Sequence, residues 1–313
     1  MRHDLDDVLA QAAAWHAGGH GVAIATVVTT WGSSPRPPGS KLAVDDRGEF
    51  VGSVSGGCIE AAVVDAAVDL IAGRGEPRVL EFGVADETAW SVGLACGGTI
   101  AVYVGRITPA LLEAAHAPRP IALATSLYGG AQDLIAAADP RARRAFANDR
   151  AEVIDGALIE PIALPLRLII VGAVHVASPL AAMARLAGFA VTIVEPRRAW
   201  ASAVRFPDES IVSAWPDVAV RELAPDARTA IVTLTHDPKL DDPALIAALA
   251  SPAFYIGCLG STRTHAARLE RLAAVGDVAR LHGPVGLPIG ARSPAEIAIS
   301  ILGEIVRDLR KRA

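Results

Sequence analysis

Two short turns in the first third of the chain place a cysteine beside paired glycines. Ser55–Cys58 (SGGC) runs directly into a helical pattern that starts at Ile59, and the second turn is Cys96–Gly98 (CGG). Glycine-rich backbone at a helix start presents unpaired N–H groups to an anion, and the same positive end favours a thiolate. The alternative is a ligand-free turn with a buried thiol, which is common for free cysteine. Two such turns in one small domain favour a shared binding site.

The second half contains the layout of a dinucleotide-binding unit. The predicted strand Leu168–Val171 runs into Gly172, and a helix, a second strand and Glu195 follow. Strand, glycine turn, helix and strand, with an acid about 20 residues after the glycine, are typical of a Rossmann unit. The second glycine of that fingerprint, which lets a pyrophosphate approach, is Val174 here. The sequence therefore predicts a Rossmann-like fold and leaves nucleotide binding open.

Polar residues follow several predicted strands of this half. Ligands of parallel α/β sheets lie beyond the carboxyl ends of the strands, so His175, Glu195, His236 and Cys258 could converge there. Two histidines and an acid could bind a metal or transfer a proton. Asp237 could serve as a catalytic acid or equally as the cap of the helix that follows it. No motif with metal-ligand spacing and no nucleophile triad is present in the sequence.

Composition narrows the classes of function. A chain of 313 residues with 52% apolar residues predicts about two domains with an ample core. The net charge of −5 and the 4% aromatic content argue against nucleic-acid binding. No apolar run approaches the roughly 20 residues of a membrane span. Three cysteines without a CxxC pair fit no disulfide framework, so a reducing cytoplasm is the expected location.

The elements that position these residues fall into two groups. Residues 1–150 are expected to form an α+β domain that holds both cysteine turns, with a helix at Asp4–Ala17 and a hairpin from Lys41 to Val54. The charged segment Pro140–Arg150 lacks clear periodicity and is placed at the boundary. Residues 151–313 are expected to alternate strand and helix as a Rossmann-like parallel-sheet domain. The fold class is therefore α/β, and a capping box at Ser293 starts the last helix.

These segments together resemble one known family. GSSPRPPGSK, GSVSGGCIEAAV and GLACGG resemble the XdhC/CoxI family of xanthine dehydrogenase accessory proteins. The later segments resemble that family's C-terminal Rossmann domain: IIVGAVHVASPLA, VTIVEPR, RFP, LTHDPKLDDPAL, YIGCLGS and PVGLPIGARSPAEIAISILGEI. The resemblance spans nearly the whole chain in the family's order.

The resemblance implies a chaperone of the molybdenum cofactor, an accessory protein without turnover of its own. Such a protein binds the molybdopterin cofactor and protects it. It assists the cofactor's sulfuration with a cysteine desulfurase and inserts the cofactor into a xanthine dehydrogenase-type molybdenum hydroxylase. The resemblance also implies a homodimer.

Site residues carry over from the matched motifs. The cofactor-binding candidates are Ser55, Gly56, Gly57, Cys58, Cys96, Gly97, Gly98, Gly172, His175 and Glu195. Cys58 and Cys96 are the candidate contacts to molybdenum or sulfur, because soft thiolates suit a sulfur-rich metal centre and can carry sulfane sulfur as persulfides. His236 and Asp237 lie in the matched THDPKLD motif and are the candidate catalytic residues.

The chain departs from the family at some positions, and two other functions stay open. The family usually has GAGHVA where this chain has GAVHVA, so Val174 replaces a glycine. The family usually has aspartate at the position of Glu195, and Cys258 lies outside the family pattern. An NAD(P)- or FAD-dependent oxidoreductase would use the Rossmann-like half, but Val174 weakens that interpretation and neither cysteine turn is explained by it. A metal-dependent hydrolase built on His175 and His236 has the least support.

Overall fold

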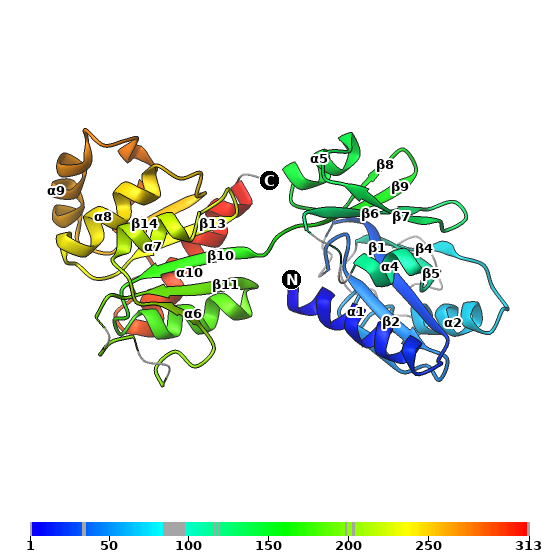
Figure 1. The fold of residues 1–313 in the computed structure, drawn as a ribbon. Coiled ribbons are helices and arrows are strands. Elements are labelled where there is room, and N and C mark those ends of the chain that lie inside the picture. Colours follow the sequence, from blue (N-terminus) through cyan, green and yellow to red (C-terminus); the bar gives the residue numbers. More distant parts are fainter. Residues whose placement is uncertain are drawn as a thin grey trace. The chain divides into compact units, whose positions relative to one another are not determined.

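The computed structural model describes residues 2–32, 36–83, 98–114, 117, 119–197, 199–201 and 204–311, with side chains from residue 8 onward. The chain divides into two compact units, Met1–Leu164 and Pro165–Ala313 (Figure 1). No helix among the described residues is long and apolar enough to cross a membrane. Each unit is described below by itself.

The first unit contains an antiparallel sheet in the order β3-β2-β1-β5-β4. Its strands are β1 (Val22–Trp31), β2 (Lys41–Asp45), β3 (Phe50–Gly52), β4 (Arg78–Phe82) and β5 (Thr99–Arg106). Helices α1 (Arg2–Ala17) and α2 (Glu60–Ile71) cover opposite faces of it. Because side chains alternate between the faces of a strand, Ala23 and Ala25 pack in the cluster with α2, and Val22 and Ile24 in the cluster with α1. The predicted hairpin from Lys41 to Val54 is confirmed as β2 and β3.

A second antiparallel sheet completes this unit in the order β7-β6-β9-β8. Its strands are β6 (Ile121–Ser126), β7 (Gln132–Ala136), β8 (Glu152–Ile154) and β9 (Ala157–Ile162), and its helices are α4 (Pro109–Ala114) and α5 (Pro140–Ala147). Because β9 pairs with β6, the first unit extends to Leu164 and not only to residue 150.

The segment expected to be a non-periodic boundary, Pro140–Arg150, instead begins as helix α5. The Asp139 side chain accepts a hydrogen bond from the Arg141 amide and so caps this helix. Only Ala142 and Ala145 are buried on it, which explains why the apolar periodicity is too sparse to read from the sequence.

The second unit is a doubly wound α/β fold around a parallel sheet, as predicted. The strand order is β12-β11-β10-β13-β14-β15. The strands are β10 (Leu166–Val171), β11 (Phe189–Val194), β12 (Ser210–Val212), β13 (Thr229–Thr233), β14 (Tyr255–Cys258) and β15 (Leu281–His282). The order reverses between β10 and β13, so the carboxyl ends of these strands flank the topological switch point.

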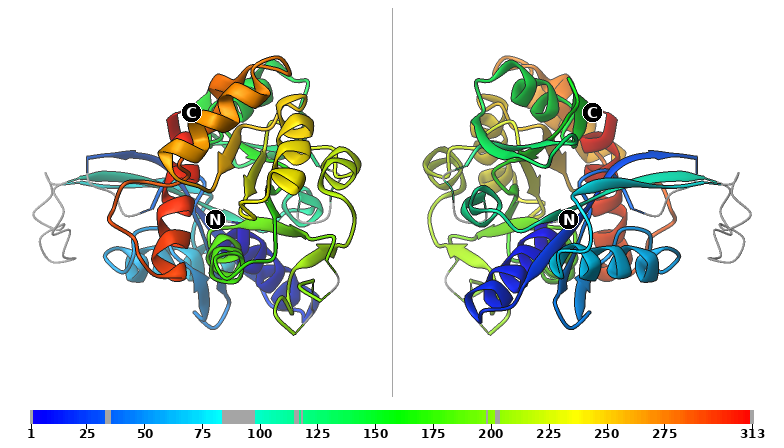
Figure 2. Two further views of the ribbon diagram at one scale, coloured as in Figure 1. Left: turned by 90° about the vertical axis from the view of Figure 1, so that its left-hand side faces the viewer. Right: turned by 90° about the vertical axis from the view of Figure 1, so that its right-hand side faces the viewer.

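Helices cover both faces of this parallel sheet. They are α6 (Ala177–Leu186), α7 (Pro216–Glu222), α8 (Pro238–Leu249), α9 (Thr262–Leu272) and α10 (Pro294–Lys311), with a 3₁₀ turn at Val278–Arg280. Figure 2 shows α8 in yellow and α10 in red on opposite sides of the strands. Ile170 packs in the cluster with α6 and α10, whereas its neighbours Ile169 and Val171 pack in the cluster with α7, α8 and α9. The predicted capping box is confirmed, since the Glu296 amide donates to Ser293 Oγ and the Ser293 amide donates to Glu296 Oε2.

A buried ion pair joins the two sheets of the first unit. Lys41 Nζ, on β2, lies 2.7 Å from Glu160 Oε1, on β9, and also donates to Thr26 Oγ1 at 2.9 Å. The side chains are 3% and 9% exposed, so neither charge is hydrated in the folded state. Removing one partner would leave the other charge buried and uncompensated.

We therefore expect Glu160→Ala to lower the free energy of unfolding by about 3–5 kcal/mol, the usual cost of breaking a buried pair. The double variant Lys41→Met with Glu160→Leu should unfold within about 1 kcal/mol of the wild type, because no buried charge remains. The exposed pair of Arg74 and Asp69 provides the control, and Asp69→Ala should cost no more than about 1 kcal/mol. Urea unfolding measures all three, and a Glu160→Ala effect as small as the control's would contradict the ionic link.

Candidate functional site

The first cysteine turn lies between β3 and α2, as its sequence predicts. Gly56 and Gly57 have φ angles of +82° and +119°, which only glycine adopts readily. Cys58 is half-buried and packs against the cluster beneath α2. The turn therefore places Cys58 two residues before the first residue of α2.

A carboxylate of the chain itself lies at the centre of this turn. Glu60 Oε1 accepts hydrogen bonds from the amides of Val54 (3.2 Å), Ser55 (2.9 Å) and Gly56 (3.1 Å), and from Ser53 Oγ (2.7 Å). Glu60 Oε2 accepts from the Gly57 amide at 2.9 Å and from Ser55 Oγ at 2.5 Å. Six donors therefore surround one buried carboxylate.

The amides that the sequence offers to an outside anion are thus bonded within the chain. Ser55 Oγ extends the network, because it accepts from the amides of Cys58 (3.0 Å) and Ile59 (3.1 Å). Glu60 was not among the residues predicted for the site. The sequence feature that could have indicated Glu60 is an acidic residue in the first turn of a helix, directly after a glycine-rich turn.

Hydrogen bonding decides the charge of Glu60. Burial alone would raise its pKa, but the hydrogen bonds from Ser55 and Ser53 outweigh burial and lower the pKa to about 2. Glu60 is therefore ionised at neutral pH.

The second cysteine turn is only partly described. Cys96 and Gly97 lie outside the described residues, and Gly98 is buried immediately before β5. The expectation that both cysteines contact one ligand stays a prediction.

In the second unit, the turn after β10 requires glycine at position 172 for steric reasons. Gly172 has a φ of +104°, and a Cβ there would lie 2.4 Å from Thr235 Cγ2. The Val174 side chain packs against the apolar core, and His175 is exposed in the turn before α6. Helix α6 has no side-chain cap, and among the described residues the amides of His175 and Val176 have no hydrogen-bond partner. This turn therefore keeps donors that an anion can use.

Glu195, the acid expected to face a ribose, is fully buried and bonded to its own chain. Its Oε2 accepts from the Ala173 amide at 2.9 Å and from Arg197 Nη2 at 2.8 Å, and its Oε1 accepts from Arg197 Nε at 2.7 Å. Burial would raise the pKa of Glu195, but Arg197 and the Ala173 amide lower it. Arg197 also lies over the Trp200 ring, 4.8 Å from its centroid. In this arrangement Glu195 holds the glycine turn and the arginine together.

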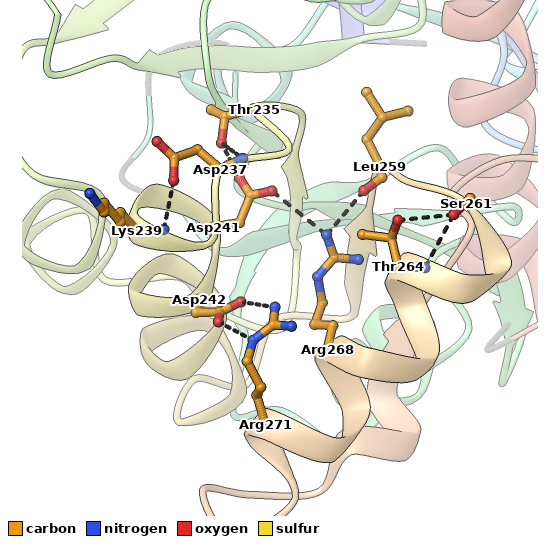
Figure 3. A network of polar contacts seen from close by, with 10 residues as sticks. All are labelled: Thr235, Asp237, Lys239, Asp241, Asp242, Leu259, Ser261, Thr264, Arg268 and Arg271. Carbon is orange, nitrogen blue, oxygen red and sulfur yellow. Dashed lines mark hydrogen bonds and ion pairs between the residues drawn. The ribbon is translucent and has the colours of Figure 1, made fainter.

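The THDPKLD motif, residues 235–241, spans the turn after β13 and the first residues of α8 (Figure 3). The Asp237 side chain accepts from the Lys239 amide at 3.0 Å and caps α8, which is the structural role considered for it. Thr235 Oγ1 donates to Asp241 Oδ1 at 2.6 Å and accepts from the Asp237 amide at 3.2 Å. His236 is exposed and has a φ of +60°, an uncommon conformation for a non-glycine residue.

Beneath this turn lies a buried polar network that the sequence did not indicate. Arg268 of α9 donates to the Leu259 carbonyl at 3.0 Å and lies 3.7 Å from Asp241 Oδ2 (Figure 3). Burial raises the pKa of Asp241, although Thr235 and Arg268 act in the opposite direction. The network connects the turns after β13 and β14 through the interior of the unit.

The predicted convergence of polar side chains at the strand ends is wrong for Cys258. It is the last residue of β14, fully buried in the cluster with α7, α8 and α9, and burial raises its pKa to about 12. Of the four residues predicted to converge, His175 and His236 have exposed side chains, and they follow the neighbouring strands β10 and β13.

Two family models match this chain. The model of the XdhC Rossmann domain matches residues 168–305, and the model of the XdhC and CoxI family matches residues 15–83. The chain belongs to the XdhC and CoxI family. The match over residues 15–83 includes the whole Cys58 turn and Glu60.

Relatives of known name align along most of the chain. The molybdenum cofactor insertion chaperone PaoD of Escherichia coli is 28% identical over 297 residues, which cover 92% of this chain and 83% of PaoD. A Bacillus subtilis protein, named as a probable subunit of xanthine dehydrogenase, is 27% identical over 314 residues, 92% of this chain and 93% of the relative. A crystal structure titled as a xanthine dehydrogenase from Bacillus halodurans shares the fold with a TM-score of 0.80 at 24% identity, covering 99% of this chain and 97% of that chain.

The Glu60 network generates a prediction for stability against pH. Because the pKa of Glu60 is lowered to about 2, its ionisation stabilises the fold above the unfolded-state value near 4.5, and this stabilisation is lost as the pH falls toward 2. Glu60→Gln should therefore cost about 3 kcal/mol at pH 7, and the difference from the wild type should shrink between pH 5 and pH 2. Urea unfolding at several pH values measures this difference, and one that stays constant with pH would contradict the charged network.

Proposed function

We propose that this chain binds the molybdenum cofactor, protects it, assists its sulfuration and inserts it into a xanthine dehydrogenase-type molybdenum hydroxylase. Family membership supports this proposal, as do relatives named for molybdenum cofactor insertion and for xanthine dehydrogenase. The observation that carries it is the Cys58 thiol, half-buried on a rigid turn at the head of α2. A half-buried thiol on a fixed backbone is open to a ligand, whereas the buried Cys258 is not.

The residues present fit the two chemical ends of this cofactor. Cys58 offers a soft sulfur donor, the type that suits a sulfur-bound metal. The unpaired amides at the start of α6 offer donors to a phosphate. In this proposal the first unit offers Cys58, together with Cys96, to a metal or to sulfur. The second unit, considered by itself, offers the turn from Gly172 to His175 and the start of α6 to a phosphate. The cofactor itself would supply the molybdenum centre that the recipient enzyme uses.

Binding and transfer, without turnover, account for the chemistry of these residues. The exposed His175 and His236 would contact the cofactor's polar groups, while Asp237 keeps α8 in place as its cap. A cysteine desulfurase is the proposed source of sulfur, and a homodimer in a reducing cytoplasm is the proposed working form. An NAD(P)- or FAD-dependent oxidoreductase is less well supported, because Glu195 is bonded to Ala173 and Arg197 and Val174 fills the place of the fingerprint's second glycine.

Molybdenum retention tests this function. Purified protein mixed with molybdenum cofactor should elute from gel filtration with bound molybdenum, measured by elemental analysis. Cys58→Ala should lower the retained metal about tenfold or more, on the scale of changes at metal sites. Cys258→Ala is the matched control, since it removes a thiol that lies in the apolar core and should leave retention unchanged.

Two results would count against the proposal. One is complete separation of molybdenum from the wild-type protein. The other is tight binding of NAD(H) or NADP(H) with steady hydride transfer, which would favour the oxidoreductase.

A further inference from the structure

The Cys58 turn has the shape of an anion-binding site, but an anion of the chain already fills it. The amides of four consecutive residues, Val54–Gly57, donate to Glu60 at distances from 2.9 to 3.2 Å. We propose that Glu60 is the resident anion of this turn, which closes its amides to a phosphate and positions Cys58 as the group that meets the ligand. The identity of that ligand rests on the proposed function, whereas the closure of the amides does not.

Competition for the amides favours the internal carboxylate. Glu60 is 8% exposed, and both of its oxygens are bonded to donors of the turn. A phosphate at the same amides would have to displace this carboxylate or lie within a few ångströms of it, where like charges repel. Because Glu60 is the first residue of α2, its carboxylate is held close to the turn by the chain. Unlike a free phosphate, it loses no translational entropy when it accepts these hydrogen bonds.

The network also positions the thiol-bearing residue. The Ser55 hydroxyl donates a hydrogen bond to Glu60 Oε2, and its oxygen lone pairs accept hydrogen bonds from the amides of Cys58 and Ile59. The hydroxyl keeps this orientation while Glu60 offers it an acceptor oxygen. Glu60 is therefore a positioning residue for Cys58, and it acts through Ser55.

A specificity follows for the class of ligand. With its amides satisfied, the turn presents sulfur and not N–H donors. It therefore selects a thiophilic partner, such as a sulfur-bound metal or sulfane sulfur, and excludes the phosphate end of a cofactor.

A phosphate titration of the wild-type protein tests the closure directly. With ¹⁵N-glycine labelling, the amide signals of Gly56 and Gly57 should not move when inorganic phosphate is added at constant ionic strength. Saturable shifts of these two signals would overturn the proposal, and this measurement needs no variant and no cofactor.

Complementation by added anions tests the resident role. Glu60→Ala should lower the melting temperature, and formate or phosphate should raise it again relative to chloride at equal ionic strength, because the emptied amides accept a new anion. The Gly56 and Gly57 signals of the variant should now shift with phosphate. Asp65→Asn is the matched control, since it removes an exposed charge from the same helix and should show no anion-specific effect.

The Glu60→Gln variant tests the positioning role if Glu60→Ala does not fold. If Glu60→Ala does not fold, Glu60→Gln replaces it, because the amide keeps one acceptor oxygen and the volume of the side chain. A folded Glu60→Gln should retain less molybdenum than Asp65→Asn, and equal retention would overturn the positioning role. Loss of retention by the wild type would contradict the proposed function alone, because the phosphate titration and the anion complementation would still report on the turn.

Discussion

The first unit depends on one carboxylate held among backbone amides. Positive φ angles at Gly56 and Gly57 turn successive N–H groups toward the same point, where they would be unsatisfied and mutually repulsive without an anion. Glu60 supplies that anion from the first turn of α2, so the turn and the helix stabilise each other. The thiol of Cys58 is thereby held on backbone that cannot relax independently of the helix.

The second unit uses the same device at its own glycine turn. Glu195 accepts from the Ala173 amide directly after Gly172, and Arg197 neutralises its charge. In both units an acid from a neighbouring element bonds the amides of a glycine turn. The difference lies at the helix start that follows. Ser55 Oγ accepts from the amides of Cys58 and Ile59 in the first unit, whereas the amides of His175 and Val176 have no partner within the described part of the second unit. Anion binding is therefore better supported at the second turn.

The sequence predicts the architecture well because its signals there are local and strong. The buried strands of the parallel sheet appear as apolar runs, and the box that starts α10 is specified by Ser293 and Glu296. Helix α5 was not predicted because its buried face consists of two small residues, Ala142 and Ala145, which give only a weak apolar signal. The end of the first unit at Leu164 is not readable from local sequence either. It depends on the pairing of β9 with β6, which joins residues more than thirty positions apart along the chain.

The candidate site was predictable only in part, because the spacing of residues along the sequence does not predict which side chains bond to which amides. The sequence locates the glycine turns, and the steric contact between Gly172 and Thr235 explains one of them. It does not show that Glu60 and Glu195 satisfy the amides of those turns. Nor does it show that Arg268 lies 3.7 Å from Asp241, since that pairing joins two different helices through the interior.

The THDPKLD motif shows how the structure separates roles that its sequence leaves together. Thr235 packs against Gly172 and donates to Asp241, and Asp237 caps α8, so these residues have structural roles in the fold. His236 makes no such contribution among the described residues: its side chain is exposed, and its backbone has a left-handed conformation that costs about 1 kcal/mol or more. The hydrogen bond from the Asp237 amide to Thr235 and the cap of α8 hold the residues around it. The proposal that His236 contacts a ligand therefore rests on an exposed residue in a strained conformation at the switch point of the parallel sheet.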